Sequence, residues 1–504
     1  MSESHKSSRQ KIIKDSGHYV GSSVLGQVFG LVRAVLMPVF FSPAQLGIWN
    51  VLNLILSYCP HAQLGLTHGM NKSIPMMIGT GNKEEQKKIQ NSVFWTNLFL
   101  SLLAMIGLLG SSFFVSQHYI WPIRILAIVV FVQMMYYFFF SLLRANSKFI
   151  LVSNGIFLTS VLSTILVIGM LYLFPNPVIG GLIGMGIAIL IVLIYWMIKG
   201  AYRFPYKIDA RTIKACFMLG IPILGIGILE SLTVSIDRIF IASNMSPAQL
   251  GYYALGIMIS GIVGLIPGSV ASVLYSTMLE RYSINKDPKD VASLLIGPMR
   301  MMWALVAILI CGIIIVIPGL IVLFLPKYIP AIPIVELLIF GSFFMSSSHV
   351  PGMFIIAINK QKFIIIAQIC SICAVFLIDA LLVHLGLGLR GIAIGTICGY
   401  IIYGVGYTAI ALSTVVDNPK IVLKYIFWQV FPLLMLTGTF LFLNWILPYT
   451  TNTLQYILWA FVRLVILLAL LTFYLWIVNR DNMVINFAKE ELLKVLRRFN
   501  KKTA

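Results

Sequence analysis

Long apolar runs separated by short polar segments recur along the whole chain of 504 residues. Each run is about 20 to 25 residues long, and a helix of that length crosses a hydrocarbon core of roughly 30 Å because each residue rises about 1.5 Å. The segments between the runs are too short for a separate globular domain. The pattern therefore predicts an all-α polytopic membrane protein with about fourteen transmembrane helices, at residues 17–40, 46–70, 92–115, 120–142, 150–174, 178–198, 215–241, 250–277, 300–325, 330–357, 363–386, 390–412, 425–446 and 455–478.

The composition supports this prediction. Hydrophobic residues make up 59% of the chain and charged residues 10%, and the mean hydropathy is +0.96. Such values exclude a water-soluble globular protein. A basic segment precedes the first span, as in a signal peptide, but this span is too long, contains Arg33 and lacks a cleavage site of small residues. We therefore expect the first span to be retained as a helix.

Lys and Arg residues are distributed unevenly between alternate loops. Of the 36 Lys and Arg residues, 30 fall on the predicted side of the two termini, whereas the opposite loops contain only Arg124, Lys327 and Arg390. Because loops rich in Lys and Arg stay in the cytoplasm, both termini are predicted to be cytoplasmic. The net charge of +20 therefore reflects topology and requires no nucleic-acid partner. The basic tail at 484–499 is predicted to form an amphipathic helix on the anionic inner leaflet.

The chain contains an internal repeat. The sequence SPAQLG, here called the SPAQLG motif, occurs at Ser42–Gly47 and again at Ser246–Gly251, each time in a short outer loop between a first and a second span. Two halves of six helices each insert with the same orientation, as in parallel-repeat transporters. We expect two pseudo-symmetric six-helix bundles at 1–208 and 209–415, with helices 13 and 14 and the tail at 416–504. Rocking of two such bundles around a central cavity would give alternating access.

Several of these segments resemble a known family. The stretches Gly220–Gly225 (GIPILG) and Ser235–Phe240 (SIDRIF), together with both SPAQLG motifs, are similar to bacterial polysaccharide and O-antigen flippases of the Wzx type. These belong to the multidrug/oligosaccharidyl-lipid/polysaccharide (MOP) exporter superfamily. The resemblance extends over the whole chain in length, span number and repeat layout.

The resemblance has functional implications. It implies a MATE-like fold that moves an undecaprenyl-pyrophosphate-linked oligosaccharide across the bacterial cytoplasmic (inner) membrane for cell-surface polysaccharide biosynthesis. It also implies membrane lipids and other polysaccharide assembly proteins as partners, and no catalytic residues or bound cofactor. A cavity for this cargo needs cations for the diphosphate and hydroxyl or amide groups for the sugars.

Ionisable residues inside the spans are candidates for such a cavity, because each costs roughly 2.5 to 3.5 kcal/mol at the centre of a bilayer. Arg33 in the first span suits a phosphate, which a guanidinium binds with two hydrogen bonds. Snorkelling or an ion pair with a neighbouring helix is the alternative. His61 and His68 are predicted to share one face of the second span, where they either line the cavity or hydrogen-bond to a neighbouring helix. Arg463 could contact headgroups, a partner or a groove for the prenyl tail, and the sequence does not decide between them.

Four acidic residues are candidates for coupling transport to a sodium or proton gradient. Glu230 and Asp237 are spaced to share one face of the seventh span with Thr233, above a kink at Pro222. The alternative for Asp237 is a structural interaction with the neighbouring arginine.

The other two acids, Glu336 and Asp379, are predicted to lie in the outer half of the bilayer. They could serve coupling, cap a helix, or pair with Lys327 or Arg390. The CxxC at Cys370 and Cys373 is interpreted as a pair of buried soft side chains, because a metal or redox site would need polar neighbours. No metal site is predicted.

Three other functions remain to be weighed. A cation-coupled multidrug exporter would be expected to carry an acid in the first helix, whereas residues 17–41 contain Arg33 and no carboxylate. A membrane glycan polymerase or ligase would need a large outer loop with catalytic residues, and the outer loops are short. No phosphate-binding loop of the GxxxxGK[ST] type occurs, which argues against ATP hydrolysis. An assembly scaffold stays open.

Overall fold

The computed structural model describes residues 21–22, 25–115 and 117–446, and most positions between 458 and 472. Helices dominate this part of the chain, and none of its residues lies in a strand. Eleven of its helices are long and apolar enough to cross a membrane, and Leu25–Phe40 is a shorter apolar helix. The predicted all-α membrane architecture is thus confirmed. The basic N-terminal segment and the tail at 484–499 lie outside the described residues.

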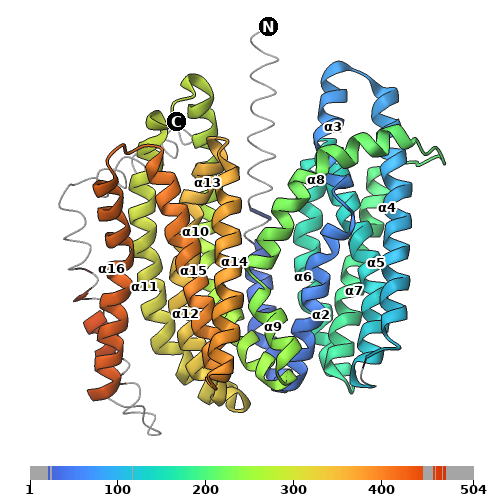
Figure 1. Cartoon of the computed structure of the whole chain (residues 1–504). Coiled ribbons are helices and arrows are strands. Elements are labelled where there is room, and N and C mark those ends of the chain that lie inside the picture. The colour runs from blue at the N-terminus through green and yellow to red at the C-terminus, as the bar shows by residue number, and fades with distance from the viewer. Residues whose placement is uncertain are drawn as a thin grey trace, which may run out of the picture. The chain divides into compact units, whose positions relative to one another are not determined.

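The contacts divide the chain into two compact units, which are described separately (Figure 1). The first unit comprises Met1–Ser235 and Asn244–Gly251, and the second comprises Ile236–Ser243 and Tyr252–Ala504. Helix α8 therefore groups with the first unit, although the sequence repeat places residue 209 at the start of the second half. The predicted repeat boundary concerns sequence similarity and stays a prediction, as does the orientation in the membrane.

Long helices pack side by side in the first unit (Figure 1). Leu25–Phe40 is followed by α2 (Pro43–Ala62), α3 (Leu66–Thr80), α4 (Lys83–Ser111), α5 (Gln117–Ala145), α6 (Phe149–Leu173), α7 (Pro177–Gly200) and α8 (Ala210–Thr233). Trp196 of α7 is fully buried, stacks on Tyr136 of α5 and donates its indole N–H to the Leu151 carbonyl at 2.9 Å. Gly155 of α6 makes room for this ring, because a Cβ there would lie 2.1 Å from it.

The second unit contains the remaining helices. These are α9 (Ile236–Asn244), α10 (Pro247–Asn285), η1 (Pro288–Val291), α11 (Ala292–Phe324), η2 (Pro326–Ala331), α12 (Ile332–Ser347), α13 (His349–Ala357), α14 (Gln361–His384), α15 (Gly388–Ser413) and α16 (Pro419–Ile446), although Asn244 and the first turn of α10 group with the first unit. Gly395, Gly399 and Gly404 let α15 approach its neighbours closely, as small residues do in membrane proteins. A Cβ on Gly404 would lie 2.5 Å from the Phe344 carbonyl oxygen of α12.

The second and seventh predicted spans are each interrupted. Helix α2 ends at Ala62 and α3 begins at Leu66, and Gly65 between them has a left-handed backbone with φ of +77°. Gly65 also abuts Gly220 of α8, since a Cβ on Gly220 would lie 1.9 Å from the Gly65 carbonyl oxygen. Both positions therefore require glycine. In the seventh span, α8 ends at Thr233 and α9 begins at Ile236.

Candidate transport site

Two acidic side chains are buried within the second unit. Asp237 in the first turn of α9 is 2% exposed, and Asp379 on α14 is fully buried. The Tyr253 hydroxyl of α10 donates a hydrogen bond to Asp237 Oδ2. Thr396 Oγ1 of α15 lies 2.8 Å from that hydroxyl and 3.4 Å from the same carboxylate oxygen. Three helices, α9, α10 and α15, therefore meet at the Asp237 carboxylate, and this cluster is here called the Asp237 network.

The backbone next to Asp237 completes its surroundings. The Arg238 backbone N–H donates to Asp237 Oδ1 at 2.7 Å, and the Arg238 guanidinium Nε lies 3.9 Å from that oxygen. The predicted structural interaction between Asp237 and Arg238 is thus present. It does not exclude a coupling role, because the second carboxylate oxygen faces Tyr253 and Thr396.

Asp379 lies within electrostatic range of Asp237. Neither of its carboxylate oxygens has a hydrogen-bond partner among the described residues. Its Oδ1 occupies the space beside Gly395, where a Cβ would lie 2.0 Å away. A buried carboxylate without a partner is costly to ionise, and a neighbouring carboxylate raises that cost. Asp379 and Asp237 together can therefore hold a proton, or a hard cation through their oxygen atoms.

Glu230 and Asp237 do not share a helix face, so this prediction is wrong. The Val234 N–H closes α8 by donating to the Glu230 carbonyl at 3.4 Å, and the chain turns before α9 begins. Glu230 is exposed and lies in the first unit, whereas Asp237 is buried in the second. The turn uncouples the two side chains because helical spacing applies only within a continuous helix.

His61 and His68 do not lie on one continuous helix, as their spacing had assumed. His61 lies in the last turn of α2 and His68 lies on α3, beyond the left-handed turn at Gly65. His61 Nε2 is 2.8 Å from the Ser231 hydroxyl of α8. Next to this pair, the Tyr58 hydroxyl lies 2.8 Å from the Ser235 hydroxyl. These two pairs form a polar seam between α2 and α8. The His61 pair is the predicted helix-to-helix hydrogen bond, whereas no sequence pattern pointed to the pair of Tyr58 and Ser235.

Arg33 lies in the helix Leu25–Phe40 and is half-buried. Among the described residues it forms no ion pair and no hydrogen bond through its side chain. A protein acid to balance this intramembrane charge is therefore lacking in the described part of the chain. The predicted alternative of pairing with a neighbouring helix is not observed there.

The remaining candidates lie in the second unit. Glu336 on α12 is half-buried, and Arg463 in the last span is 3% exposed. Cys370 and Cys373 are exposed on α14, so the prediction that they are buried is wrong. Their side chains lie on the exposed side of α14, whereas Asp379, six residues beyond Cys373, lies on its buried side.

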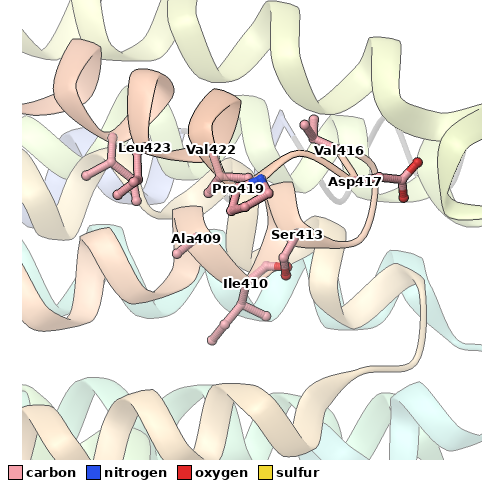
Figure 2. A pocket seen from close by; sticks show the side chains of 9 residues that line it. Ala409, Ile410, Ser413, Val416, Asp417, Pro419, Val422 and Leu423 are labelled. Carbon is pink, nitrogen blue, oxygen red and sulfur yellow. The ribbon is translucent and has the colours of Figure 1, made fainter.

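A pocket of about 730 Å³ opens where α15 leads into α16 (Figure 2). Its walls are mostly apolar and come from the end of α15, including Ala409 and Ser413, and from the start of α16, including Leu423. At the pocket's edge Asp417 pairs with Lys289, with 2.7 Å between the carboxylate oxygen and the ammonium nitrogen. Its lining suits a hydrocarbon chain next to a polar headgroup.

Comparison with known proteins assigns the chain to a family and identifies structures with a similar fold. The profile of the polysaccharide biosynthesis protein family matches residues 40–306, so the chain belongs to that family. By sequence, no curated protein matches. Lipid II flippase MurJ in an inward closed conformation superposes with a TM-score of 0.68 at 17% identity, over 94% of this chain and 100% of MurJ.

Two further solved structures have a similar fold. An inward-facing multidrug resistance MATE family transporter of the MOP superfamily gives 0.66 at 14% identity, over 78% of this chain and 96% of the other. A MOP superfamily transporter from Pyrococcus furiosus, whose binding pocket is described as reversed in polarity, gives 0.54 at 14%, over 80% and 95%. The protein is thus a multi-pass membrane protein of the polysaccharide biosynthesis protein family, with the fold that these transporters and the flippase share.

Proposed function

We propose that this protein moves an undecaprenyl-pyrophosphate-linked oligosaccharide from the inner to the outer leaflet of the bacterial cytoplasmic membrane by alternating access. The observation that carries the proposal is Arg33, a half-buried intramembrane guanidinium without an acidic partner in the described part of the chain. A charge at this depth is costly unless a counter-charge is supplied. The diphosphate of a lipid-linked glycan is such a counter-charge and accepts both arms of the guanidinium.

Other features of the two units, each taken by itself, suit the rest of the cargo. The polar seam between α2 and α8 offers imidazole and hydroxyl groups, which hydrogen-bond sugars. Glu230 and His68 add ionisable groups without a side-chain hydrogen bond or ion pair among the described residues. The apolar pocket between α15 and α16 suits part of the prenyl chain. A drug exporter for organic cations fits less well, because the first helix carries a cation instead of an acid.

Coupling to a sodium or proton gradient is proposed to occur at Asp237 and Asp379. The two carboxylates share a buried region, and Asp379 has no partner among the described residues. A bound cation or proton removes the cost of the second charge. Binding there stabilises one packing of α9, α10, α14 and α15, and a transport cycle can use that difference between conformations.

The test uses purified protein in proteoliposomes with a radiolabelled lipid-linked oligosaccharide on one leaflet. Arg33→Ala is expected to lower the affinity for the cargo about ten- to hundredfold, because a charged hydrogen bond contributes roughly 1.5 to 3 kcal/mol. Arg33→Lys should be intermediate, since it keeps the charge and loses the planar fork. Arg211→Ala, which removes an exposed arginine in the first turn of α8, is the matched control.

Two results would contradict the proposal. Full transport by Arg33→Ala would remove this residue from the binding site. Transport of an organic cation in preference to the lipid-linked glycan by the unmodified protein would favour the exporter. In cells, deletion of the gene should lead to accumulation of the lipid-linked oligosaccharide on the inner leaflet.

A further inference from the structure

The two SPAQLG motifs lie together in the first unit. The first begins α2, and the second begins α10, whose first turn up to Gly251 groups with the first unit while the body from Tyr252 groups with the second. A six-residue identity within one chain suggests that both copies do the same physical task. The contacts of the two motifs show what that task is.

Each motif builds the same self-sufficient helix start. Ser42 caps α2: its hydroxyl accepts from the Gln45 N–H at 3.3 Å, and the Gln45 side chain accepts from the Ser42 N–H at 2.9 Å. Ser246 and Gln249 repeat this reciprocal arrangement at 3.4 and 3.1 Å. Proline follows the serine in both copies, at the first helical position, where no N–H is needed.

The glycine that ends each motif is the point of contact between the two helices. A Cβ on Gly47 would lie 1.8 Å from the Pro247 carbonyl oxygen, and a Cβ on Gly251 would lie 1.8 Å from the Pro43 carbonyl oxygen. The two contacts are reciprocal, as in a twofold interface. Because an ordinary contact begins near 3.4 Å, an alanine would force the backbones apart by about 1.6 Å. Only glycine permits this approach.

This contact is suited to opening. Each proline carbonyl also accepts the N–H of the glycine four residues later in its own helix, and each helix start is capped by its own serine. Separation therefore leaves no backbone group unpaired. Each glycine brings its Cα–H close to a proline carbonyl oxygen of the other helix, which is a weak contact, and the positive ends of two helix dipoles are brought together, which opposes it.

We propose that the paired SPAQLG motifs form a reversible clasp, which is closed in this conformation and separates during the transport cycle. The inference rests on the alternating access of the proposed function. It explains why this hexapeptide is identical in both halves, because both helices of a twofold contact need the same cap, the same proline and the same glycine.

The first experiment measures opening directly. In a variant without native cysteines, Leu250→Cys places a thiol at a position that is 1% exposed when the clasp is closed. A membrane-impermeant maleimide is added from each side in turn. Gly47→Ala is expected to raise the labelling rate about tenfold, because loss of the close approach favours the open form. Gly107→Ala on α4, where a Cβ meets open space, should leave it unchanged.

An unchanged labelling rate with Gly47→Ala would overturn the proposal. A second experiment keeps both glycines, in case Gly47→Ala fails to fold. Ala44→Cys with Ala248→Cys places one thiol in each motif, and a short bifunctional, reductively cleavable maleimide joins them. Transport should stop on cross-linking and return after cleavage. Full transport by the cross-linked protein would show a permanent contact and refute the clasp.

The two proposals fail in different ways. If the cargo is not a lipid-linked oligosaccharide, the unmodified protein will not move it in proteoliposomes, yet labelling of the thiol at position 250 will still respond to Gly47→Ala. If the clasp is wrong, the unmodified protein transports the cargo, and neither labelling nor cross-linking behaves as described.

Discussion

Loss of one hydroxyl should separate a coupling role of the Asp237 network from a purely structural one. Tyr253→Phe keeps the buried ring and removes only the group that donates to Asp237 Oδ2 and contacts Thr396. Asp237 then keeps the Arg238 backbone N–H at 2.7 Å and a distant Thr396 hydroxyl at 3.4 Å. The carboxylate thereby loses the hydrogen bond from the Tyr253 hydroxyl.

The size of the effect follows from that loss. A hydrogen bond to a charged group contributes roughly 1.5 to 3 kcal/mol, which corresponds to about a ten- to hundredfold change in an equilibrium constant. If the Tyr253 oxygen is also a ligand of the coupling ion, the ion concentration for half-maximal transport should rise by this factor. Thr396→Val should have a smaller effect in the same direction, because its oxygen is farther from Asp237.

The assay is transport into proteoliposomes at a series of sodium concentrations and, separately, of pH gradients. Thr408→Val is the matched control for Thr396→Val, since Thr408 is also buried on α15. Its hydroxyl has no partner among the described residues. Melting temperatures with and without sodium provide a readout that is independent of the cargo. If Tyr253→Phe lowered the melting temperature while the ion dependence stayed unchanged, the network would be structural and the coupling argument would fail.

Three further predictions follow from other parts of the structure. Gly155→Ala should lower the free energy of unfolding by about 1 to 3 kcal/mol, because its Cβ would overlap the buried Trp196 ring; Gly169→Ala on the same helix meets open space and should not, as thermal melting in detergent will show. Ser413→Trp should fill the pocket between α15 and α16 and slow transport of a long-chain cargo more than of a short-chain analogue, and equal rates would argue against a prenyl site. The Thr212 hydroxyl at 2.6 Å and the Lys88 ammonium at 2.9 Å hold the pKa of Asp209 below its usual range, so its contribution to stability is present at neutral pH and is lost only as the pH falls below about 4; the melting difference between the unmodified protein and Asp209→Asn should therefore stay constant from pH 7 to about pH 4 and shrink below that, and a difference that already shrinks above pH 5 would contradict this.

The class of protein and most of its helices could be predicted from the residues alone. Run length and apolar composition are local properties, and a bilayer admits few backbone structures other than helices. The internal repeat and the resemblance to polysaccharide flippases were likewise visible in the residues, and the family match and the MOP fold agree with them. Individual candidates such as Arg33 and Asp379 were identified because a charge is conspicuous in an apolar run.

The breaks in the spans and the contacts between distant side chains become visible only in the folded protein. The turn at Gly65 depends on the approach of Gly220 from another helix, and the turn before Ile236 separates Glu230 from Asp237. A spacing rule that assumes one continuous helix fails at both places. Asp237 meets Tyr253 and Thr396 only because three helices pack together, and the SPAQLG motifs meet only because both of their glycines lie at one crossing. Contacts between residues far apart in the chain depend on the packing of whole helices, which local hydrophobic patterns do not encode.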